Sequence, residues 1–505
     1  MTSTTSTETL AERVSAVLAL SPDAGAVEFQ GVWTSWRALA QAAEAIEARL
    51  EVLGVPKDAP VGWVARNRPA GVAAFVALLR AGRPIAPLRP NQSVAGFCEE
   101  IRAQRLMAIV GDREDWSLPG VAEAAKSAGS AGICVDEADG RYAVTLYSGL
   151  ENVGPGPHRD PAPGMVVERL SSGTTGPPKR IPVDVDKMMP ALRQTEETQS
   201  VNAGAPLALK SSPAIILSPF THAGGIFALL LNIYQARPVV IFDKFEVGRW
   251  VEAVRNYQPK SATLVPAMIR MILDSDTPRA ALASLKAVRS GTAALDPAAQ
   301  IEFEERFGIP VLIDYGAAEF IGGVAGWSLG EHRSYAKEKL GSVGRVRPDV
   351  QIRTIDPDTK EELPKGAIGQ LELHSSRFSP DWIRTNDFAR IDEDGFMYIH
   401  GRLDDAINRG GFKILPDDVS PVIRAFPGVQ DATVVGFPDP RLGQVPVAII
   451  EAPGGPVDVE ALRAFLKERL AAYQVPVDYR FIDAFPRTTT MKIARPELKK
   501  MLGLA

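Results

Sequence analysis

The stretch LSSGTTGPPKR, residues 170–180, is rich in glycine and hydroxyl side chains but has almost no side chain that could fill a core. It follows the apolar run MVVERL (165–170), which predicts a strand, and precedes a helix expected to begin near Asp184. Glycines let backbone amides approach an anion closely, and hydroxyls and a lysine can bind phosphate oxygens. The stretch predicts a polyphosphate-binding loop, with a flexible surface loop as the alternative. It is not a Walker A loop, because Pro178 stands where that motif needs its second glycine. The candidate phosphate-binding residues are Ser171, Ser172, Gly173, Thr174, Thr175, Gly176 and Lys179.

Short β-branched runs alternate with amphipathic helical patterns around this loop, from about residue 60 to 315. The alternation predicts an α/β fold of mainly parallel sheets flanked by helices on both faces. One helix is well marked, because Asp296 can cap it, Pro297 suits its first turn and Gly308 can end it. The other predicted strands are PVGWVA (60–65), AIILSPF (214–220), PVVIFD (238–243), SATLVP (261–266), LKAVRSG (285–291) and PVLIDYG (310–316).

The pattern changes after about residue 340, where alternating strands follow one another without helices. These strands predict a small antiparallel or β-barrel-like subdomain. A mixed α and β pattern follows GRLDD (401–405). We therefore expect a large N-terminal domain, residues 1–401, and a small mobile α+β C-terminal domain, residues 402–505. The strands are VQIRTID (350–356), GQLELHS (369–375), FMYIHG (396–401), DATVVGF (431–437) and VPVAIIEA (445–452), and the helices are DDVSPVIRAF (417–426) and VEALRAFLKERL (459–470).

Composition limits the class of protein. The 505 residues exceed what one core supports, and 45% apolar content with a net charge of −5 gives no sign of a nucleic-acid surface. Cys98 and Cys134 form no CxxC or Cys/His cluster, so neither a disulfide framework nor a zinc site is expected. The N-terminus has no basic region followed by an apolar run, and the longest apolar stretch, 225–234, is too short to span a bilayer. We expect a cytoplasmic protein without a membrane span; a homodimer is left open.

Six further motifs follow the loop along the chain: SPFTHAGG (218–225), SGTAAL (290–295), DYGAAE (314–319), TNDFAR (385–390), GRLDDAINRGGFKI (401–414) and PRTTTMKIAR (486–495). With the loop, and in this order, they make the chain resemble the adenylate-forming superfamily of acyl-CoA synthetases, luciferases and peptide-synthetase adenylation domains. The similarity extends from residue 34 to residue 500. The resemblance implies that a carboxylate attacks the α-phosphorus of ATP with loss of pyrophosphate, and that a thiol then captures the acyl-adenylate. ATP, Mg²⁺ and coenzyme A (CoA) are the implied cofactors and co-substrate.

The resemblance also implies roles for single residues. Lys492 would neutralise charge at the α-phosphate, Glu319 would hold Mg²⁺, and Asp387 with Arg402 would bind the ribose hydroxyls. Taken alone, Lys492 is compatible with a solvated surface charge, and Asp387 with a turn or cap residue. Thr174, Glu319 and Lys492 are the candidate catalytic residues.

The adenine base would lie against Tyr315, with Asp314 accepting from its amino group. Taken alone, Tyr315 is equally an ordinary aromatic residue at a strand end. Asp404 matches the hinge of the C-terminal domain. The remaining implied sites are Thr292, Ala293, Ala294 and Gly316 around the base, His222, Gly224, Gly291 and Phe320 in the acid pocket, and Gly410 and Gly411 on the CoA side.

The acid pocket is expected to have apolar walls, which favours an aromatic or medium-chain hydrophobic acid. His222 is kept as a pocket-wall candidate, although a lone histidine is more often structural. The expected wall residues are Phe220, Phe227, Phe320, Ile321 and Trp327.

Five positions depart from the family pattern. Ala318 lacks a hydroxyl that normally contacts the α-phosphate, and Arg180 is expected to add phosphate affinity. Met491 stands where the family has glycine and is expected to crowd Lys492, and Asn386 and Thr292 also stand where the family has glycine. These departures bear on rate and fine geometry more than on the class of reaction.

Three functions remain in competition. The leading one is an ATP-dependent acid–CoA ligase. The second is a stand-alone adenylation enzyme that loads a carrier protein, and the third is a nucleotide-binding paralogue with impaired catalysis. In the amino-acid-activating members of the superfamily that the chain resembles, an aspartate at this position anchors the substrate ammonium. Here Thr221 follows Phe220, so the resemblance disfavours an α-amino acid substrate. A nicotinamide oxidoreductase is disfavoured because no GxGxxG follows an early strand.

Overall fold

The computed structural model describes residues 8–170, 179–199, 206–316, 320, 322–376, 379–410, 412–488 and 491–504. The chain forms two compact units. The expected boundary between residues 401 and 402 stays a prediction. Unit 1 comprises Met1–Thr263, Thr277–Lys286 and Ala317–Gly322, and unit 2 comprises Leu264–Asp276, Ala287–Gly316 and Gly323–Ala505.

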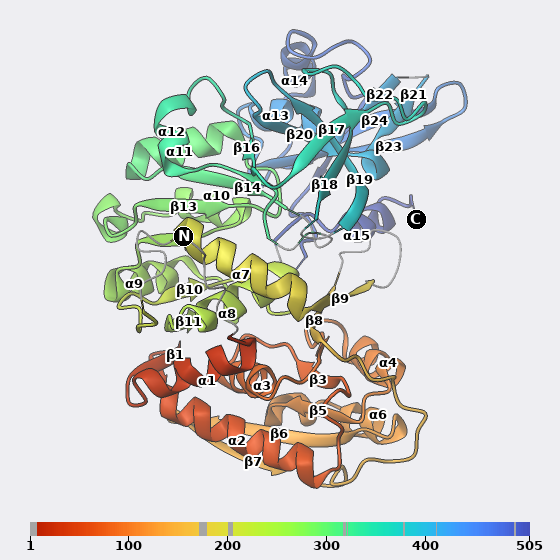
Figure 1. The fold of residues 1–505 in the computed structure, drawn as a ribbon. Helices are drawn as coiled ribbons and strands as arrows, with labels where there is room; N and C mark the ends of the chain where they lie inside the picture. Colours follow the sequence, from red (N-terminus) through yellow and green to blue (C-terminus); the bar gives the residue numbers. More distant parts are fainter. Residues whose placement is uncertain are drawn as a thin grey trace. The chain divides into compact units, whose positions relative to one another are not determined.

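The main sheet of unit 1 has seven strands in the order β7-β6-β5-β3-β4-β8-β9 (Figure 1). The five central strands run parallel, and the two edge strands pair antiparallel with their neighbours. This confirms the expected parallel α/β architecture. The strands are β3 (Val61–Val64), β4 (Ile85–Leu88), β5 (Ala108–Gly111), β6 (Ala131–Ala138), β7 (Arg141–Leu146), β8 (Met165–Leu170) and β9 (Arg180–Asp184).

Helices cover both faces of this sheet. Along β3, Val61 and Trp63 belong to one buried cluster with side chains of α1, α2 and α3, whereas Val64 belongs to another with side chains of α4 and α6. A strand buried on both faces reads as a continuous apolar run, as β3 does. Within the described ranges, no helix is long and apolar enough to cross a membrane. The helices are α1 (Leu10–Leu20), α2 (Trp36–Val52), α3 (Pro69–Arg80), α4 (Val94–Gln104), α5 (Arg113–Trp116) and α6 (Val121–Ser127).

The opening stretch leads into a strand and not directly into a helix. β9 pairs antiparallel with β8, so that Leu170 faces Arg180, and helix α7 (Val185–Gln199) begins only after β9. Residues 171–178 themselves lie outside the described residues. The helix expected to begin near Asp184 is confirmed by α7, whereas strand β9 in front of it was not expected.

A second sheet of unit 1 has the order β10-β11-β1-β2, in which only β2 runs antiparallel to its neighbour. Its strands β10 and β11 confirm the expected strands in AIILSPF and PVVIFD. The strands of this sheet are β1 (Gly25–Phe29), β2 (Val32–Ser35), β10 (Ala214–Ile216) and β11 (Val239–Ile241), and further elements of unit 1 are α8 (Ala223–Tyr234), α9 (Val247–Tyr257), β12 (Ser261–Thr263) and η1 (Arg279–Leu282).

In unit 2, helix α11 joins two parallel strands, β13 and β14. Asp296 caps this helix by accepting a hydrogen bond from the Ala298 amide at 2.9 Å, and Gly308 ends it with φ +69°. Both expected end signals of the helix are confirmed. The elements are α10 (Pro266–Leu273), β13 (Ala287–Ser290), α11 (Pro297–Phe307), β14 (Val311–Tyr315), β15 (Ala325–Gly326), α12 (Leu329–Tyr335) and β16 (Arg345–Val346).

An antiparallel meander, β17-β18-β19-β20, follows in unit 2 and confirms the antiparallel subdomain expected after residue 340. A final sheet has the strand order β22-β21-β24-β23 (Figure 1), with β25 beside β24. Its residues share one buried core with residues of α13 and α14. The elements are β17 (Gln351–Ile355), β18 (Gly369–Ser375), β19 (Ser379–Ile391), β20 (Met397–Arg402), η2 (Leu403–Asp405), β21 (Ile407–Arg409), β22 (Phe412–Ile414), α13 (Pro416–Arg424), β23 (Asp431–Asp439), β24 (Gly443–Glu451), α14 (Val459–Lys467), β25 (Asp478–Ile482) and α15 (Arg495–Met501).

Candidate active site

Unit 2 brings together four of the residues singled out in the sequence. Tyr315 ends strand β14, and its hydroxyl donates a short hydrogen bond to the carboxylate of Asp387 on β19. Asp387 faces Arg402 across the β19–β20 pair, with 3.9 Å between the Asp387 Oδ1 and Arg402 Nε atoms. Lys492 lies within electrostatic reach of both Asp387 and Arg402. We call Tyr315, Asp387, Arg402 and Lys492 the acid–base cluster.

Lys492 lies in the segment 486–494, of which residues 486–488 and 491–494 are described. Backbone hydrogen bonds join these two parts, which we call the Lys492 hairpin. The Thr488 amide donates to the Lys492 carbonyl at 2.8 Å, and the Ala494 amide donates to the Pro486 carbonyl at 2.7 Å. The Lys492 amide in turn donates to the Thr488 hydroxyl at 3.2 Å. These bonds define the backbone from which the amine projects.

Electrostatics lowers the pKa of Lys492 below its usual value. The largest cause is desolvation, because surrounding protein displaces water from the amine, and repulsion by the Arg402 cation adds to it. The Asp387 carboxylate opposes both effects. Lys492 is nevertheless exposed to solvent, so water moderates the shift. A phosphate anion beside the amine would favour its charged form.

Asp314 has partners that the sequence did not reveal. Its Oδ2 atom lies 2.7 Å from Nη1 of Arg289, and its Oδ1 atom lies 3.5 Å from Nη2 of Arg347. A contact with an adenine amino group would have to share this carboxylate with two guanidinium groups. The role expected for Asp314 therefore stays a prediction, and Arg289 and Arg347 are site neighbours that no short motif marks.

The bend between β13 and α11 contains the segment expected beside adenine. Gly291 must be small, because a Cβ atom there would lie 2.9 Å from the Asp314 carbonyl oxygen. Thr292 adopts φ +70°, in the left-handed region that favours glycine. Thr292 and Ala294 are exposed, and Ala293 is half-buried. Gly316, which follows Tyr315, is also exposed.

Met491 also adopts a left-handed conformation, with φ +62°. The expectation that Met491 crowds Lys492 stays a prediction; the structure shows in addition that the methionine side chain stands on a glycine-like backbone. We expect Met491→Gly to raise the free energy of unfolding by about 0.5–1 kcal/mol, because relief of about 1–2 kcal/mol of strain exceeds the entropic cost of glycine, about 0.5–1 kcal/mol. Equilibrium urea unfolding measures this change. Met491→Ala keeps the Cβ atom and should bring no gain; a glycine variant no more stable than the alanine variant would contradict the assignment.

In unit 1, the 218–225 motif is held by Asn67. The Asn67 side chain donates to the Ser218 carbonyl at 3.0 Å and accepts from the Phe220 amide at 2.8 Å. Phe220 is fully buried against Trp63, with 5.9 Å between ring centroids, so it packs in the core. His222 is the N-cap residue of α8.

Two further pocket candidates of unit 1 differ in their surroundings. Gly224 has open space where a Cβ atom would stand. Phe320 is 2% exposed, and its carbonyl accepts from Arg169 at 2.6 Å. Trp327, in unit 2, is also buried, and its indole donates to the Ser342 carbonyl. The pocket roles of these residues stay predictions.

Arg180 is engaged by carboxylates, which corrects the expectation that it adds phosphate affinity. Its guanidinium lies 2.6 Å from Glu100 and 3.0 Å from Glu168, and it donates to the Pro87 carbonyl at 2.9 Å. These partners stand far from Arg180 in the sequence, so no local pattern indicates them. Lys179 beside it is exposed.

The expected hinge lies in a short 3₁₀ turn. Asn386 donates to the Asp404 carboxylate at 2.8 Å, and Arg402 lies 3.7 Å from the same carboxylate. On the expected CoA side, Gly410 has φ +56°, and its amide donates to the Leu442 carbonyl at 2.8 Å. Gly411 lies outside the described residues.

The expected metal ligand Glu319 and its neighbour Ala318 also lie outside the described residues, as does Ile321. Within the ranges that the structure describes, no three His, Cys, Asp or Glu side chains come together as a metal site. Cys98 and Cys134 are buried and free.

The chain is thus an α/β protein of two compact units, and unit 2 contains the acid–base cluster. A family model described as "AMP-binding enzyme" matches residues 14–378, and one described as "AMP-binding enzyme C-terminal domain" matches residues 419–492. The chain therefore belongs to the AMP-binding enzymes of the adenylate-forming superfamily, which confirms the resemblance seen in the sequence.

Curated relatives include a fatty acid–[acyl-carrier-protein] ligase, ScoC, of Streptomyces coeruleorubidus, which is 30% identical over 68% of this chain and 69% of that protein. An oxalate–CoA ligase of Arabidopsis thaliana is 30% identical over 64% of this chain and 65% of that protein. Across several curated relatives that it matches, the chain spans 60–66% of the relative's length.

Solved structures share the fold. ATP-bound MatB from Rhodopseudomonas palustris has a TM-score of 0.81 at 21% identity, over 97% of this chain and 98% of that chain. The amide bond synthetase McbA from Marinactinospora thermotolerans has a TM-score of 0.79 at 22% identity, over 98% of this chain and 99% of that chain. The α/β fold expected from the sequence is confirmed.

Proposed function

We propose that this protein is an ATP-dependent carboxylic acid–CoA ligase that works through an acyl-adenylate. The observation that carries the proposal is the acid–base cluster, because four residues from distant motifs meet in one place in a chain of the AMP-binding family. The printed names of several relatives, among them oxalate–CoA ligase and 2-succinylbenzoate–CoA ligase, support a CoA-dependent reaction.

The first half-reaction brings two anions together. A carboxylate oxygen of the acid attacks the α-phosphorus of ATP, the bond to the bridging oxygen breaks, and pyrophosphate leaves with the electron pair. Positioned cations must offset the charge that builds up, since there is little other chemistry for the protein to perform. Lys492 and Arg402 supply two positive charges beside Asp387, and Lys492 is the residue assigned to the α-phosphate and acyl oxygens.

The nucleotide assignments fit the polar atoms of the cluster. The Asp387 carboxylate has two acceptor oxygens and suits the vicinal hydroxyls of a ribose. The Arg402 Nε atom is shielded from solvent and has no hydrogen-bond partner among the described residues, so it can donate to a nucleotide oxygen. Tyr315 would lie against the base. Mg²⁺, with Glu319 as its proposed ligand, would neutralise phosphate charge when bound.

The second half-reaction transfers the acyl group. The thiol of CoA loses its proton, the sulfur attacks the acyl carbonyl carbon, and AMP leaves with the former carboxylate oxygen. We assign Asp404 to the hinge about which residues 402–505 turn between the two steps, and Gly410 and Gly411 to the approach of the pantetheine arm.

We propose an aromatic or medium-chain hydrophobic acid as substrate, because the segments expected to line the acid pocket are rich in apolar residues, among them Phe227, which is half-buried on α8 directly after the 218–225 motif. Delivery of the acyl group to a carrier protein is the second candidate, and the similarity to a fatty acid–[acyl-carrier-protein] ligase favours it. A reducing, cytoplasmic location is proposed with these co-substrates, consistent with the free thiols of Cys98 and Cys134.

A panel of aromatic, aliphatic and dicarboxylic acids tests the proposal. Pyrophosphate release is measured with ATP and Mg²⁺, with and without CoA, and acyl-CoA is detected by mass spectrometry. The ligase predicts acid-dependent pyrophosphate release and acyl-CoA. Pyrophosphate release without acyl-CoA would favour a carrier protein as acceptor. ATP binding with no pyrophosphate release for any acid would refute the ligase and favour the impaired paralogue.

Asp387→Asn should weaken ATP binding about 10- to 100-fold, because hydrogen bonds to a charged group are worth roughly 1.5–3 kcal/mol. Isothermal titration with ATP, in the absence of acid, measures the affinity. Asp381→Asn is the matched control, since Asp381 is exposed on the same strand, β19. ATP affinity of Asp387→Asn equal to that of the control would remove Asp387 from the nucleotide site.

A further inference from the structure

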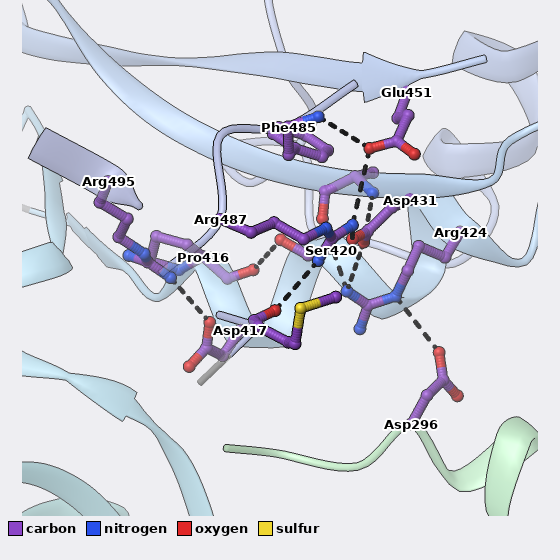
Figure 2. Close-up of polar contacts among 12 residues, drawn as sticks. Asp296, Pro416, Asp417, Ser420, Arg424, Asp431, Glu451, Phe485, Arg487 and Arg495 are labelled. Carbon is purple, nitrogen blue, oxygen red and sulfur yellow. Dashed lines mark hydrogen bonds and ion pairs between the residues drawn. The ribbon is translucent and has the colours of Figure 1, made fainter. Parts of the chain in front are cut away.

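The hairpin that carries Lys492 is held near both ends by arginines (Figure 2). At its start, Arg487 donates from Nη1 to the Met491 carbonyl at 3.3 Å and from Nη2 to Asp431 at 2.8 Å. At its end, Arg495 lies 2.8 Å from Asp405 and 3.1 Å from Asp417. The Met491 carbonyl belongs to the peptide bond that leads into Lys492, so Arg487 acts on the backbone directly beside the lysine.

Asp431 is a fixed anchor for Arg487. It begins strand β23, where its Oδ1 atom accepts from the Ala432 amide at 2.8 Å and lies 3.4 Å from Arg424. Glu451 faces Asp431 across the β23–β24 pair, lies 3.5 Å from Arg487 and accepts from the Phe485 amide at 2.9 Å. Two carboxylates on paired strands thus hold both the entry to the hairpin and its first arginine (Figure 2).

These ion pairs are partly buried, so their electrostatic attraction is stronger than that of ion pairs on the surface. The side chains of Asp431 and Glu451 are 19% and 9% exposed, and that of Arg487 is 27% exposed. Water screens such partly buried charges less than exposed ones. Loss of Arg487 would leave Glu451 with no cation among its described partners, so the segment would rearrange.

The same network reaches the helix that follows the proposed adenine segment. Arg424, which shares Asp431 with Arg487, also lies 3.3 Å from the carboxylate of Asp296. Asp296 caps α11, directly after the bend that contains Thr292 and Ala294. A continuous chain of alternating charges therefore runs from the Lys492 hairpin to the α11 N-terminus (Figure 2).

We propose that Arg487 and Asp431 are positioning residues, which hold the hairpin so that the Lys492 amine lies beside the other three residues of the acid–base cluster. The arginine fork is essential to this role, because a planar guanidinium donates to the Met491 carbonyl and to Asp431 at once. A lysine keeps the charge but cannot reproduce both contacts with the same geometry. That the positioned amine serves adenylate formation rests on the proposed function; the positioning itself does not.

Arg487→Lys is the decisive variant, and Arg480→Lys is its matched control. Arg480 makes an exposed pair with Asp478 on β25. We expect Arg487→Lys to lower kcat for pyrophosphate release roughly 10- to 100-fold, since small misplacement of a catalytic group can cost 10²-fold. KM for ATP should change less than about twofold, because ground-state binding is retained. Arg480→Lys should match the wild type.

A double-mutant cycle separates positioning from general destabilisation. In a Lys492→Ala background, Arg487→Lys should have almost no further effect on kcat, because both changes act through one amine. Additive losses, or wild-type kcat in Arg487→Lys, would overturn the proposal. Asp431→Asn provides a second variant if Arg487→Lys fails to fold, and it should show the same non-additivity.

Two measurements on the full-length protein need no activity. Hydrogen exchange of the peptide that contains residues 486–494 should be faster in Arg487→Lys than in Arg480→Lys, and the pH dependence of Lys492 acylation should shift toward that of an ordinary lysine. Unchanged exchange and labelling would overturn the proposal. A wild-type protein that releases no pyrophosphate with any acid would refute the proposed function alone, and these two measurements would still decide the positioning role.

Discussion

Lys492→Ala should slow pyrophosphate release from ATP and acid at least about a hundredfold, because loss of one preorganised charge stabiliser costs roughly 10²- to 10³-fold in rate. The structure supports the assignment by placing the amine within electrostatic reach of Asp387 and Arg402. Single-turnover adenylation, measured with labelled ATP in the absence of CoA, isolates the first step. KM for ATP should change much less than kcat, since the interaction is made mainly in the transition state.

Lys499→Ala is a suitable control for this prediction. Lys499 is exposed on α15, the helix that follows the hairpin, and it belongs to no cluster described above. Its loss should leave adenylation unchanged. A Lys492→Ala enzyme that releases pyrophosphate at a near-normal rate would remove Lys492 from the first half-reaction.

Asp404→Pro should slow thioester formation and leave adenylation almost unchanged. Proline is tolerated in the first turn of a helix, and Asp404 lies in the 3₁₀ turn Leu403–Asp405, so the conformation seen here can accept it. The proline ring fixes φ, so it blocks the change in φ that rotation of the C-terminal domain would need at residue 404. Adenylation should stay within about threefold of wild type, while thioester formation falls at least about tenfold, as expected when a conformational step is lost.

The control is Asp404→Ala, which removes the contacts to Asn386 and Arg402 but leaves the backbone free to turn. Thioester formation should survive in this variant far better than in Asp404→Pro. Equal losses of adenylation and thioester formation in the proline variant would argue against rotation about residue 404.

Most of the fold could be predicted, because a strand that is buried on both faces has a continuous run of apolar residues in the sequence. Runs such as MVVERL and PVLIDYG are continuous and β-branched, and both form strands in the parts of the sheets that helices cover. Strand β19 was not expected, because most side chains before Phe388 are exposed or half-buried and the segment lacks an apolar period. β9 was missed for a related reason, since Arg180 and Pro182 interrupt its apolar run.

The sequence motifs mark some residues of the site, but they do not mark residues that join it through ion pairs with partners far away in the sequence. Tyr315, Asp387, Arg402 and Lys492, which the motifs mark, lie near one another, and the roles assigned to them stay predictions. The departures from glycine at Thr292 and Met491 were visible, but their left-handed backbone could be seen only in the structure.

Charge partners explain the remaining differences. Arg180 meets Glu100 and Glu168, and Asp314 meets Arg289, and each pairing joins residues that no local pattern connects. The same holds for the contact between Arg487 and Asp431 that positions the lysine hairpin. Long-range ion pairs depend on how strands and helices pack, so a single sequence gives no signal for them.

Oxygen transfer tests the central claim most directly. The best acid of the panel is prepared with ¹⁸O in both carboxylate oxygens and converted to its thioester with ATP and CoA, and the released AMP and pyrophosphate are analysed by mass spectrometry. Attack of the carboxylate on the α-phosphorus predicts one ¹⁸O atom in each AMP and none in pyrophosphate. Label in orthophosphate, or AMP without label, would show that no acyl-adenylate forms and would contradict the account.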